Sequence, residues 1–376
     1  MLSKENLPFR HDIEEICPAL LDAFNAFEKA LRWFDPGMLS FLREKLRPFA
    51  VRLESVERRL NLIDPKGEHP AVGQFREATS LVCEALRLFA APVGIQESIM
   101  QMLKARRKIC RAQEILYSLR GLSWRVNSYF LEEPLRGRLG ELDPESPARG
   151  NVGIHHVGQD ENPYVRGTFS LYVPESYDGF GAWPLVIALH GGFGHGRDFL
   201  WTWLREARGR RFLLLSPTST GATWSLTGDD VDWDLLQRAL KYTMTNWSVD
   251  AGRLLLTGIS DGGTYALRCG LRQETPFTVL APFSCTLPAF NLRHAPERRI
   301  MWVHGTLDWM FSVDLARKYA AMLKDAGAEV IFREIGNLSH TYAREAHDSV
   351  LAWFDPACAL SLPEEGDAAG QSAPSA

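Results

Sequence analysis

The segment 253–263 constrains the fold more than any other part of the chain. It reads Arg-Leu-Leu-Leu-Thr-Gly-Ile-Ser-Asp-Gly-Gly, so an apolar strand runs directly into a Gly-x-Ser-x-Gly pattern, and a helical stretch follows. A strand that turns this sharply into a helix leaves no room for side chains beside the serine, which explains Gly258 and Gly262. The serine then projects at a helix N-terminus, where free N–H groups favour developing negative charge. We predict that Ser260 is a nucleophile; the alternative is a glycine-rich turn without chemistry.

A serine hydroxyl is a weak nucleophile, so it needs a base and an acid that orients this base. In sheets with such a turn, the acid and then a histidine follow the serine along the chain. Asp308 comes just after the apolar run 299–304, and His340 comes after the run 329–335. Because carboxyl ends of parallel strands meet at one edge of a sheet, both residues should lie beside Ser260. The sequence therefore predicts a catalytic triad of Ser260, Asp308 and His340.

Other residues compete for the roles of acid and base. Asp314 lies inside the next predicted helix, where it would point away from the serine. His347 lies on the last predicted helix and His304 inside a strand, so we interpret both as packing or hydrogen-bonded histidines. His294, in a polar loop, stays open as an alternative base.

Acyl transfer also requires two N–H donors that are aimed at the oxyanion. One is expected from the backbone of Asp261, the residue after the nucleophile. The second is expected from the glycine-rich loop that follows the apolar strand 185–189, with Gly192 as first choice and Gly191 or Phe193 as alternatives. A loop of this kind can also bind phosphate, but the chain has neither a dinucleotide fingerprint nor a Walker lysine there.

The apolar pattern changes near residue 150. Before it, apolar residues recur at helical spacing, and after residue 165 strand-like runs alternate with helical ones. This order predicts the α/β class: a doubly wound, mostly parallel sheet preceded by an all-α domain. We expect an all-α domain over 1–145, a catalytic α/β domain over 146–357 and a disordered tail over 358–376. The expected strands are 167–173, 184–189, 212–215, 253–257, 277–283, 299–304 and 329–335, the helices that follow are 232–247, 261–272, 312–326 and 343–354, and 134–163 reads as a linker.

Charge and cysteine usage exclude several classes of partner. The chain has 42 Lys and Arg against 46 Asp and Glu, a net charge of -4, which gives no electrostatic case for a nucleic-acid partner. None of the 6 cysteines forms a Cys-x-x-Cys pair, and their apolar surroundings are typical of buried thiols in a reducing compartment. The N-terminus has no apolar stretch typical of a secretory signal, and no apolar run approaches the ~20 residues of a membrane span. We therefore expect a cytoplasmic protein without a membrane span.

Short motifs over residues 165–354 occur in the order of a known enzyme group. They are Leu189-His-Gly-Gly, Ala222-Thr-Trp-Ser, Gly228-Asp-Asp-Val-Asp, Val249-Asp-Ala-Gly-Arg, Thr257-Gly-Ile-Ser-Asp-Gly-Gly and His304-Gly-Thr-Leu-Asp. This arrangement resembles serine esterases of the α/β-hydrolase superfamily, namely the polyhydroxybutyrate depolymerase-like, feruloyl-esterase-like and phospholipase/carboxylesterase groups.

The resemblance implies the α/β-hydrolase fold, the triad Ser260, Asp308 and His340, and a small-molecule carboxylic ester as substrate. It implies no metal and no organic cofactor. Asp261 departs from the pattern, because these enzymes often have asparagine there, and a carboxylate beside the oxyanion hole would disfavour anionic substrates. The same triad would also serve a thioesterase or an amidase/peptidase. A non-catalytic interaction scaffold is a further alternative, although a scaffold has no need of all three residues.

Two hypotheses concern the surroundings of this site. Trp224 and Trp309 are candidates for a substrate-binding pocket, because aromatic walls suit apolar ligands, and packing in the core is the alternative. The α/β segment has no long insertion of its own, so the helical domain is expected to act as a lid over the site. The alternative is that this domain docks a partner or forms a homo-oligomer through its helices.

Overall fold

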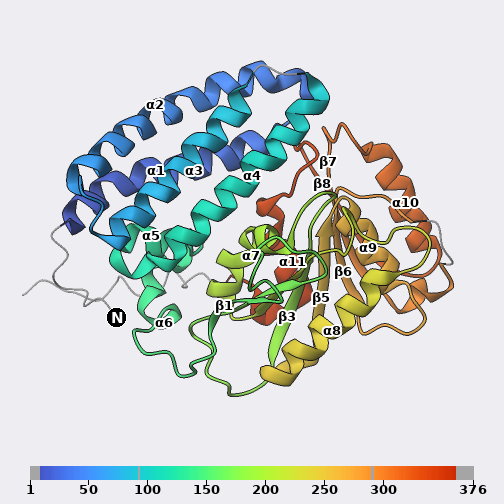
Figure 1. Ribbon diagram of the computed structural model, residues 1–376. Coiled ribbons are helices and arrows are strands. Elements are labelled where there is room, and N and C mark those ends of the chain that lie inside the picture. The colour runs from blue at the N-terminus through green and yellow to red at the C-terminus, as the bar shows by residue number, and fades with distance from the viewer. Residues whose placement is uncertain (1–8, 92–93, 289–291, 361–376) are drawn as a thin grey trace, which may run out of the picture.

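Four long helices and two short ones make up the first part of the chain. The computed structural model describes residues 9–91, 94–288 and 292–360, and in it the long helices lie side by side as a layer next to the sheet (Figure 1). The first helix begins at Arg10 and continues through Pro18, because burial of a helix face outweighs one lost hydrogen bond. The helices are α1 Arg10–Arg32, α2 Leu39–Ile63, α3 Pro70–Ala90, α4 Ile95–Ser118, α5 Trp124–Tyr129 and α6 Leu139–Leu142.

A single sheet follows, with strands in the order β1-β2-β4-β3-β5-β6-β7-β8. The pairs β1–β2 and β2–β4 are antiparallel, and all other neighbouring strands are parallel. The strands are β1 Gly153–Val157, β2 Phe169–Val173, β3 Trp183–Leu189, β4 Leu213–Pro217, β5 Val249–Ile259, β6 Val279–Phe283, β7 Arg299–Gly305 and β8 Glu329–Ile335. The helices between and after them are α7 Gly196–Arg210, α8 Val231–Asn246, α9 Asp261–Gly270, α10 Val313–Asp325 and α11 His347–Phe354.

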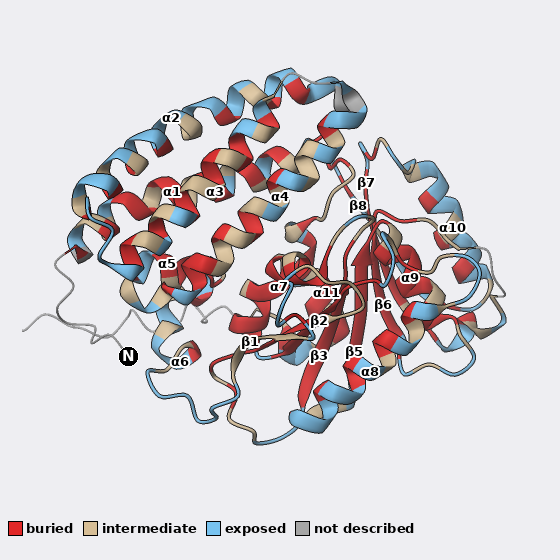
Figure 2. Cartoon of the chain, in the orientation of Figure 1, coloured by how far each residue is buried: buried red, intermediate tan, exposed pale blue. Residues whose placement is uncertain are grey.

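Alternate residues along the strands face the two sides of the sheet, as the pleat requires. On one side, strand residues such as Val186 and Leu255 pack with α7 and α11; on the other, residues such as Leu256 and Trp302 pack with α8, α9 and α10. The central strands are therefore buried on both sides (Figure 2). This mostly parallel sheet with an antiparallel second strand and helices on both faces is the α/β-hydrolase fold, which confirms the predicted fold class.

Four elements were not predicted: the strand β1, the helix α7, and the short helices α5 and α6, of which α6 also lies in the expected linker. The strand β1 lies within the expected linker, because its residues are only half-buried at the sheet edge and carry no continuous apolar run. The helix α7 was missed because its sequence combines glycine at its start with a high share of arginine, although most of its residues are buried. Its burial comes from contact with the sheet below and the helical layer above, which no local pattern reveals.

The helical layer packs on the α7 side of the sheet, and its core is continuous with the core of that side. Phe24, Phe27 and Phe130 belong to the same cluster of buried residues as Val186 and Phe283. The segments 1–145 and 146–357 thus share one hydrophobic core.

Charged and polar side chains also bond the helical layer to the rest of the chain. Arg344, after β8, donates from Nε to Glu28 of α1 at 2.7 Å and from Nη1 to Glu206 of α7 at 3.0 Å. The hydroxyl groups of Tyr117, on α4, and Tyr172, on β2, both donate to the carboxylate of Glu175, at 2.5 Å and 2.6 Å. Buried polar groups with these partners fix the relative orientation of the two segments, because any displacement would leave a charge or hydroxyl unpaired.

The structure describes the first residues of the tail expected over 358–376. Cys358, the first residue of the expected tail, is buried in the short turn Pro356–Cys358, and the remainder of that tail, 361–376, lies outside the described residues. All 6 cysteines are buried and free. Within 9–91, 94–288 and 292–360, no helix combines the length and the apolar character that crossing a membrane requires.

The ion pair between Glu114 of α4 and Arg197 of α7 gives a test of how the two segments are held together. Arg197 donates from Nε to Glu114 at 2.9 Å and also from Nη2. Burial alone would raise the pKa of Glu114, but the hydrogen bonds with His156 and Arg197 outweigh burial and lower the pKa from 4.5 to about 2. A carboxyl group whose pKa is lower in the folded state than in the unfolded state stabilises the fold. This contribution is complete at pH values above the unfolded-state pKa, and it is lost as the pH falls towards the folded-state pKa.

We expect Glu114→Gln to lower the free energy of unfolding by about 2–3 kcal/mol at pH 7. The difference from the wild type should shrink as the pH falls from 4.5 towards 2, which urea unfolding at several pH values measures. Glu141→Gln, at an exposed i,i+3 pair with Arg138, is the control and should cost less than about 0.5 kcal/mol. An equal cost for both variants, or a cost that does not change with pH, would contradict this account.

Candidate active site

The turn between β5 and α9 holds Ser260 in a strained backbone conformation. Its φ is 54° and its ψ is -125°, outside the regions that non-glycine residues normally occupy. A Cβ on Gly258 would lie 2.6 Å from the carbonyl group of Gly262, and a Cβ on Gly262 would lie 2.4 Å from the carbonyl oxygens of Leu189 and His190. Both glycines are therefore required by close backbone contacts, as the sequence pattern indicated.

The structure brings the three predicted triad residues into one chain of hydrogen bonds. The Nε2 atom of His340 lies 3.1 Å from the Oγ of Ser260, and its Nδ1 lies 2.9 Å from the Oδ2 of Asp308. Burial raises the pKa of Asp308, but the hydrogen bond with His340 and the N–H of Phe311 outweigh this and leave the pKa below its usual value. The carboxylate is therefore ionised at neutral pH. An ionised acid, a histidine and a serine that are hydrogen-bonded in this order have the geometry that proton transfer from the serine to the histidine requires.

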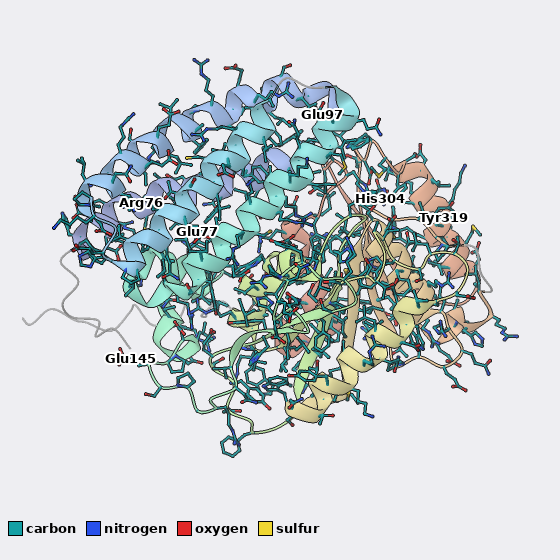
Figure 3. The ribbon with its side chains drawn as sticks, in the orientation of Figure 1. Arg76, Glu77, Glu97, Glu145, His304 and Tyr319 are labelled. Atoms are coloured by element: carbon teal, nitrogen blue, oxygen red, sulfur yellow. The ribbon has the colours of Figure 1, made fainter. Side chains whose placement is uncertain are left out.

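The competing acid and the competing histidines have partners other than Ser260. Asp314, on α10, pairs with Arg317, and its side chain is 75% exposed. His304, labelled in Figure 3, is fully buried; its Nε2 donates to the carbonyl of Phe311 at 2.8 Å, and burial lowers its pKa. Its Nε2 also lies 3.4 Å from Oδ2 of Asp308, so His304 lies behind the predicted acid and its ring is engaged by Phe311 and Asp308.

The two remaining histidines also have other partners. His347 stacks on Trp203 with ring centroids 3.8 Å apart, and its Nδ1 lies 2.8 Å from Glu206. His294 lies in the short turn Leu292–Glu297 between β6 and β7 and accepts a hydrogen bond from Arg293. The contacts of all four competitors therefore favour Asp308 and His340.

Backbone N–H groups of the expected oxyanion hole lie next to the serine. Asp261 is the first residue of α9, so its N–H has no acceptor within the helix. In the loop after β3, a Cβ on Gly191 would lie 3.5 Å from the Cβ of Ser260. Phe193 donates its N–H to the carbonyl of Ala222 at 2.8 Å, which removes it as a candidate donor. This leaves the glycines of the loop, with Gly192 still the first choice.

His190 holds the peptide group that carries the Gly192 N–H. Its Nδ1 donates to the carbonyl of Gly191 at 2.7 Å, and the N–H of Gly194 donates to the same oxygen at 3.0 Å. Burial lowers the pKa of His190 to about 3, so the ring is neutral and its Nε2 accepts from the N–H of Ser219. Because the Gly191 carbonyl and the Gly192 N–H belong to one planar peptide group, fixing the first also fixes the second.

The loop after β4 supports this arrangement. The buried carboxylate of Asp232 accepts hydrogen bonds at 2.7–2.9 Å from the backbone and hydroxyl groups of Thr220 and Ser225, which closes the loop between them. Within that loop, Thr223 donates from its hydroxyl to the Asp261 carboxylate at 2.5 Å. A Cβ on Gly192 would lie 2.8 Å from the same carboxylate oxygen, so the Asp261 carboxylate stands directly beside the predicted oxyanion donor.

The two tryptophans that the sequence indicated for a pocket have different surroundings. Trp224 is 2% exposed, stacks on Tyr265 and donates from Nε1 to the carbonyl of His190 at 2.7 Å. This placement favours a supporting role under the oxyanion loop. Trp309 is half-buried, its ring centroid lies 6.3 Å from that of His340, and its Nε1 donates to the carbonyl of Phe34 at 3.0 Å.

The contact of Trp309 with Phe34 has no signal in the sequence. Phe34 accepts through its main chain, and a carbonyl oxygen is present at every position, so residue type does not reveal it. Backbone strain would have been the better guide to the site: of the described non-glycine residues with positive φ, Phe193, Ser260, Ser284 and Asn337 lie on loops at this edge of the sheet, and Arg211 lies elsewhere.

Two cavities are lined by residues outside the predicted triad. One of about 360 Å³ is at the amino end of β3, lined by Trp183, Pro184 and several arginines. A second, of about 90 Å³, lies between α1, α4 and α7 and reaches Thr341, the residue after His340. Among the described residues, no group of three or more His, Cys, Asp and Glu side chains could hold a metal ion.

Gly262→Ala tests the close approach at the serine turn. The added methyl group would meet backbone atoms that cannot move independently, so we expect a loss of about 2–3 kcal/mol in the free energy of unfolding, measured by urea denaturation. Gly73→Ala is the matched control, because a Cβ there meets nothing within 4 Å and alanine suits the interior of α3. It should leave stability unchanged or raise it slightly. A Gly262→Ala protein as stable as the wild type would refute the steric argument.

Comparison with known proteins finds similarity in structure only. No protein-family model and no curated protein matches the sequence. Among solved structures, a ferulic acid esterase is 14% identical over 54% of this chain and 96% of its own, with a TM-score of 0.44. An acetyl xylan esterase from Aspergillus awamori is 14% identical over 54% and 98%, with a TM-score of 0.43. A thermostable esterase is 17% identical with a TM-score of 0.40, and the match spans 45% of this chain and half the length of that esterase.

Proposed function

We propose that this protein is a serine hydrolase that cleaves carboxylic esters. The observation that carries the proposal is the hydrogen-bonded series Asp308, His340, Ser260, with the serine in a strained turn at the N-terminus of α9. The supporting observation is the glycine loop after β3, whose backbone is held next to that serine by the neutral His190.

The proposed reaction proceeds in two acyl-transfer steps. The Nε2 atom of His340 takes the proton of Ser260 as its Oγ attacks the ester carbonyl, and Asp308 stabilises the resulting imidazolium. The N–H groups of Gly192 and Asp261 hold the oxyanion of the tetrahedral intermediate. His340 then gives its proton to the leaving alcohol, and the acyl group stays on Ser260. Water, deprotonated by His340, attacks the acyl-enzyme, and His340 then returns this proton to the Oγ of Ser260 as the acid leaves.

The surroundings of the triad favour an uncharged, apolar ester. Phe193 follows the proposed oxyanion donor and is 58% exposed, and Leu307 and Met310, on either side of Asp308, are 50% and 44% exposed. Exposed apolar side chains next to a reacting centre suit hydrophobic acyl or alcohol groups. The Asp261 carboxylate, beside Gly192, would repel a second negative charge.

Loss of the nucleophile is the first test of the proposed function. A fluorophosphonate probe should label the wild type at Ser260, and Ser260→Ala should abolish labelling and lower kcat on p-nitrophenyl esters by about 10⁶-fold. Asp308→Asn should lower kcat by about 10⁴-fold, because the imidazole loses its orientation and its stabilised charge. Asp314→Asn is the matched control and should retain wild-type activity. More than a tenth of wild-type activity in Ser260→Ala would eliminate Ser260 as the nucleophile.

The type of bond cleaved is tested with the same preparation. Acyl thioesters and amino-acid anilides with the same acyl group as the p-nitrophenyl ester give kcat/KM values for the three classes of leaving group. We expect the ester to be cleaved fastest. A higher kcat/KM on the thioester or anilide would move the assignment to a thioesterase or amidase with the same triad.

Neutralising Asp261 tests the proposed preference for uncharged substrates. We expect Asp261→Asn to raise kcat/KM for a p-nitrophenyl hemisuccinate, relative to the neutral p-nitrophenyl butyrate, by about tenfold. This corresponds to about 1.4 kcal/mol, the size expected for two like charges several ångströms apart near a protein surface. Asp325→Asn, on the exposed end of α10, removes the same net charge at a distance and should leave the ratio unchanged. An unchanged ratio in Asp261→Asn would show that its carboxylate does not select among substrates.

A further inference from the structure

The C-terminal end of α1 meets the loop that carries His340. Because α1 ends at Arg32, carbonyl groups there lack intrahelical donors and need other partners. The carbonyl of Arg32 accepts from the N–H of Ser339 at 3.0 Å, and the carbonyl of Phe34 accepts from the Ser339 hydroxyl at 2.5 Å. Ser339 directly precedes His340. The loop of the proposed base is thus bonded to the helical layer immediately before the histidine.

The same carbonyl oxygen of Phe34 also holds the loop of the proposed acid. Trp309, which directly follows Asp308, donates to this oxygen from Nε1 at 3.0 Å. A carbonyl oxygen has two lone pairs and can accept both hydrogen bonds. One main-chain atom of the helical layer therefore joins the residue after the acid to the residue before the base.

Nearer the strands, the loop that carries Asp308 and the loop that carries His340 are hydrogen-bonded to each other. The N–H of Leu307 donates to the carbonyl of Leu338 at 2.9 Å, and the N–H of Asn337 donates to the hydroxyl of Thr306 at 3.0 Å. A Cβ on Gly305 would lie 2.2 Å from the Leu338 carbonyl oxygen, so the loops leave their strands in close contact. The Phe34 carbonyl is the additional connection beside the catalytic residues themselves.

The residue that carries the accepting carbonyl, Phe34, is itself held in place by packing. The side chain of Phe34 is 3% exposed and packs edge-on against Phe89 of α3, with ring centroids 6.0 Å apart. Arg32 donates from its guanidinium to the carbonyl of Gly336 at 2.9 Å and pairs with Glu345. Since Ser339 is only 2% exposed, its hydroxyl has little access to water that could replace the hydrogen bond to Phe34.

We propose that the Phe34 carbonyl positions the acid and base of the triad through Ser339 and Trp309, which makes the helical layer part of the catalytic machinery. Ser339 and Trp309 are positioning residues in this account, and the account rests on the proposed function. A displacement of the imidazole or the carboxylate by a fraction of an ångström weakens proton transfer from Ser260, because proton transfer needs aligned hydrogen bonds. The helical layer supplies the alignment from outside the sheet.

The experiment removes each donor while keeping the shape of its side chain. Ser339→Ala deletes the hydroxyl, and Trp309→Phe deletes the indole N–H and keeps an aromatic ring. We expect each variant to lower kcat on p-nitrophenyl butyrate by about tenfold, and the double variant by more than either, with KM changed less than about twofold. The rise of kcat/KM with pH should shift to lower pH, because a less well-aligned Asp308 stabilises the imidazolium less. Ser339→Thr, which restores a hydroxyl, should recover most of the kcat lost in Ser339→Ala.

Two substitutions in α11 are matched controls. Ser349 donates its hydroxyl to the carbonyl of Ala346 within the helical turn, and Trp353 packs beside Arg299. Ser349→Ala and Trp353→Phe remove the same groups away from the catalytic loops and should leave kcat and the pH profile unchanged. Melting temperatures of all variants separate a loss of alignment from a loss of folded protein.

The rate of labelling by a fluorophosphonate separates the two proposals. If the wild type is not labelled at Ser260, the proposed function fails. If it is labelled, and the double variant is labelled at the same rate with an unchanged kcat and pH profile, the positioning role is refuted. If Trp309→Phe alters the preference among acyl chain lengths and KM, with kcat and the pH profile unchanged, Trp309 is a pocket wall and the positioning role is also refuted. Should the double variant unfold at the assay temperature, the two single variants and Ser339→Thr decide by the same criteria.

Discussion

A methyl group on Gly262 would come within 2.4 Å of the carbonyl oxygens of Leu189 and His190. The N-terminus of α9 therefore lies directly against the carboxyl end of β3, and the glycine loop after β3 cannot be far from the serine turn. This contact decides the geometry of the whole site, because it sets the distance between the proposed nucleophile and the proposed oxyanion donors. It also forces Ser260 into a positive φ, a strain that the surrounding sheet must support.

Support for the glycine loop comes from Asp232, for which the sequence indicated no role, and from Trp224, which the sequence suggested for a substrate pocket. Asp232 closes the loop 220–225 with four hydrogen bonds, and this loop supplies a carbonyl to Phe193 and the Trp224 indole to the carbonyl of His190. Trp224 then holds the loop by hydrogen bonding and stacking, with its ring turned towards the core. A motif residue of this kind contributes to chemistry through the backbone that it fixes.

The helical layer is built into the structure at three levels. Its apolar side chains share the core of the α7 side of the sheet, its charged side chains pair with α7 and with the segment after β8, and the end of α1 is bonded to the loops of Asp308 and His340. If the helical layer opened as a lid, it would have to break all of these contacts. The arrangement therefore favours a fixed wall and support over a mobile lid.

The sequence by itself predicted most of the order of strands and helices, the serine turn and the three residues of the proposed triad. These follow from local rules: an apolar strand, a turn that only glycine allows, and polar residues just past strand ends. Local rules were insufficient for β1 and α7, whose burial depends on neighbours distant in the chain. They also left Gly191 and Phe193 open as alternatives to Gly192, until a hydrogen bond to Ala222 occupied the Phe193 N–H. Tertiary structure alone decided that Trp224 faces the core, that Asp261 stands beside Gly192, and that Phe34 meets the loops of Asp308 and His340. The physical reason is that these are contacts between main-chain atoms or between segments far apart in sequence, and residue type and spacing carry no information about them.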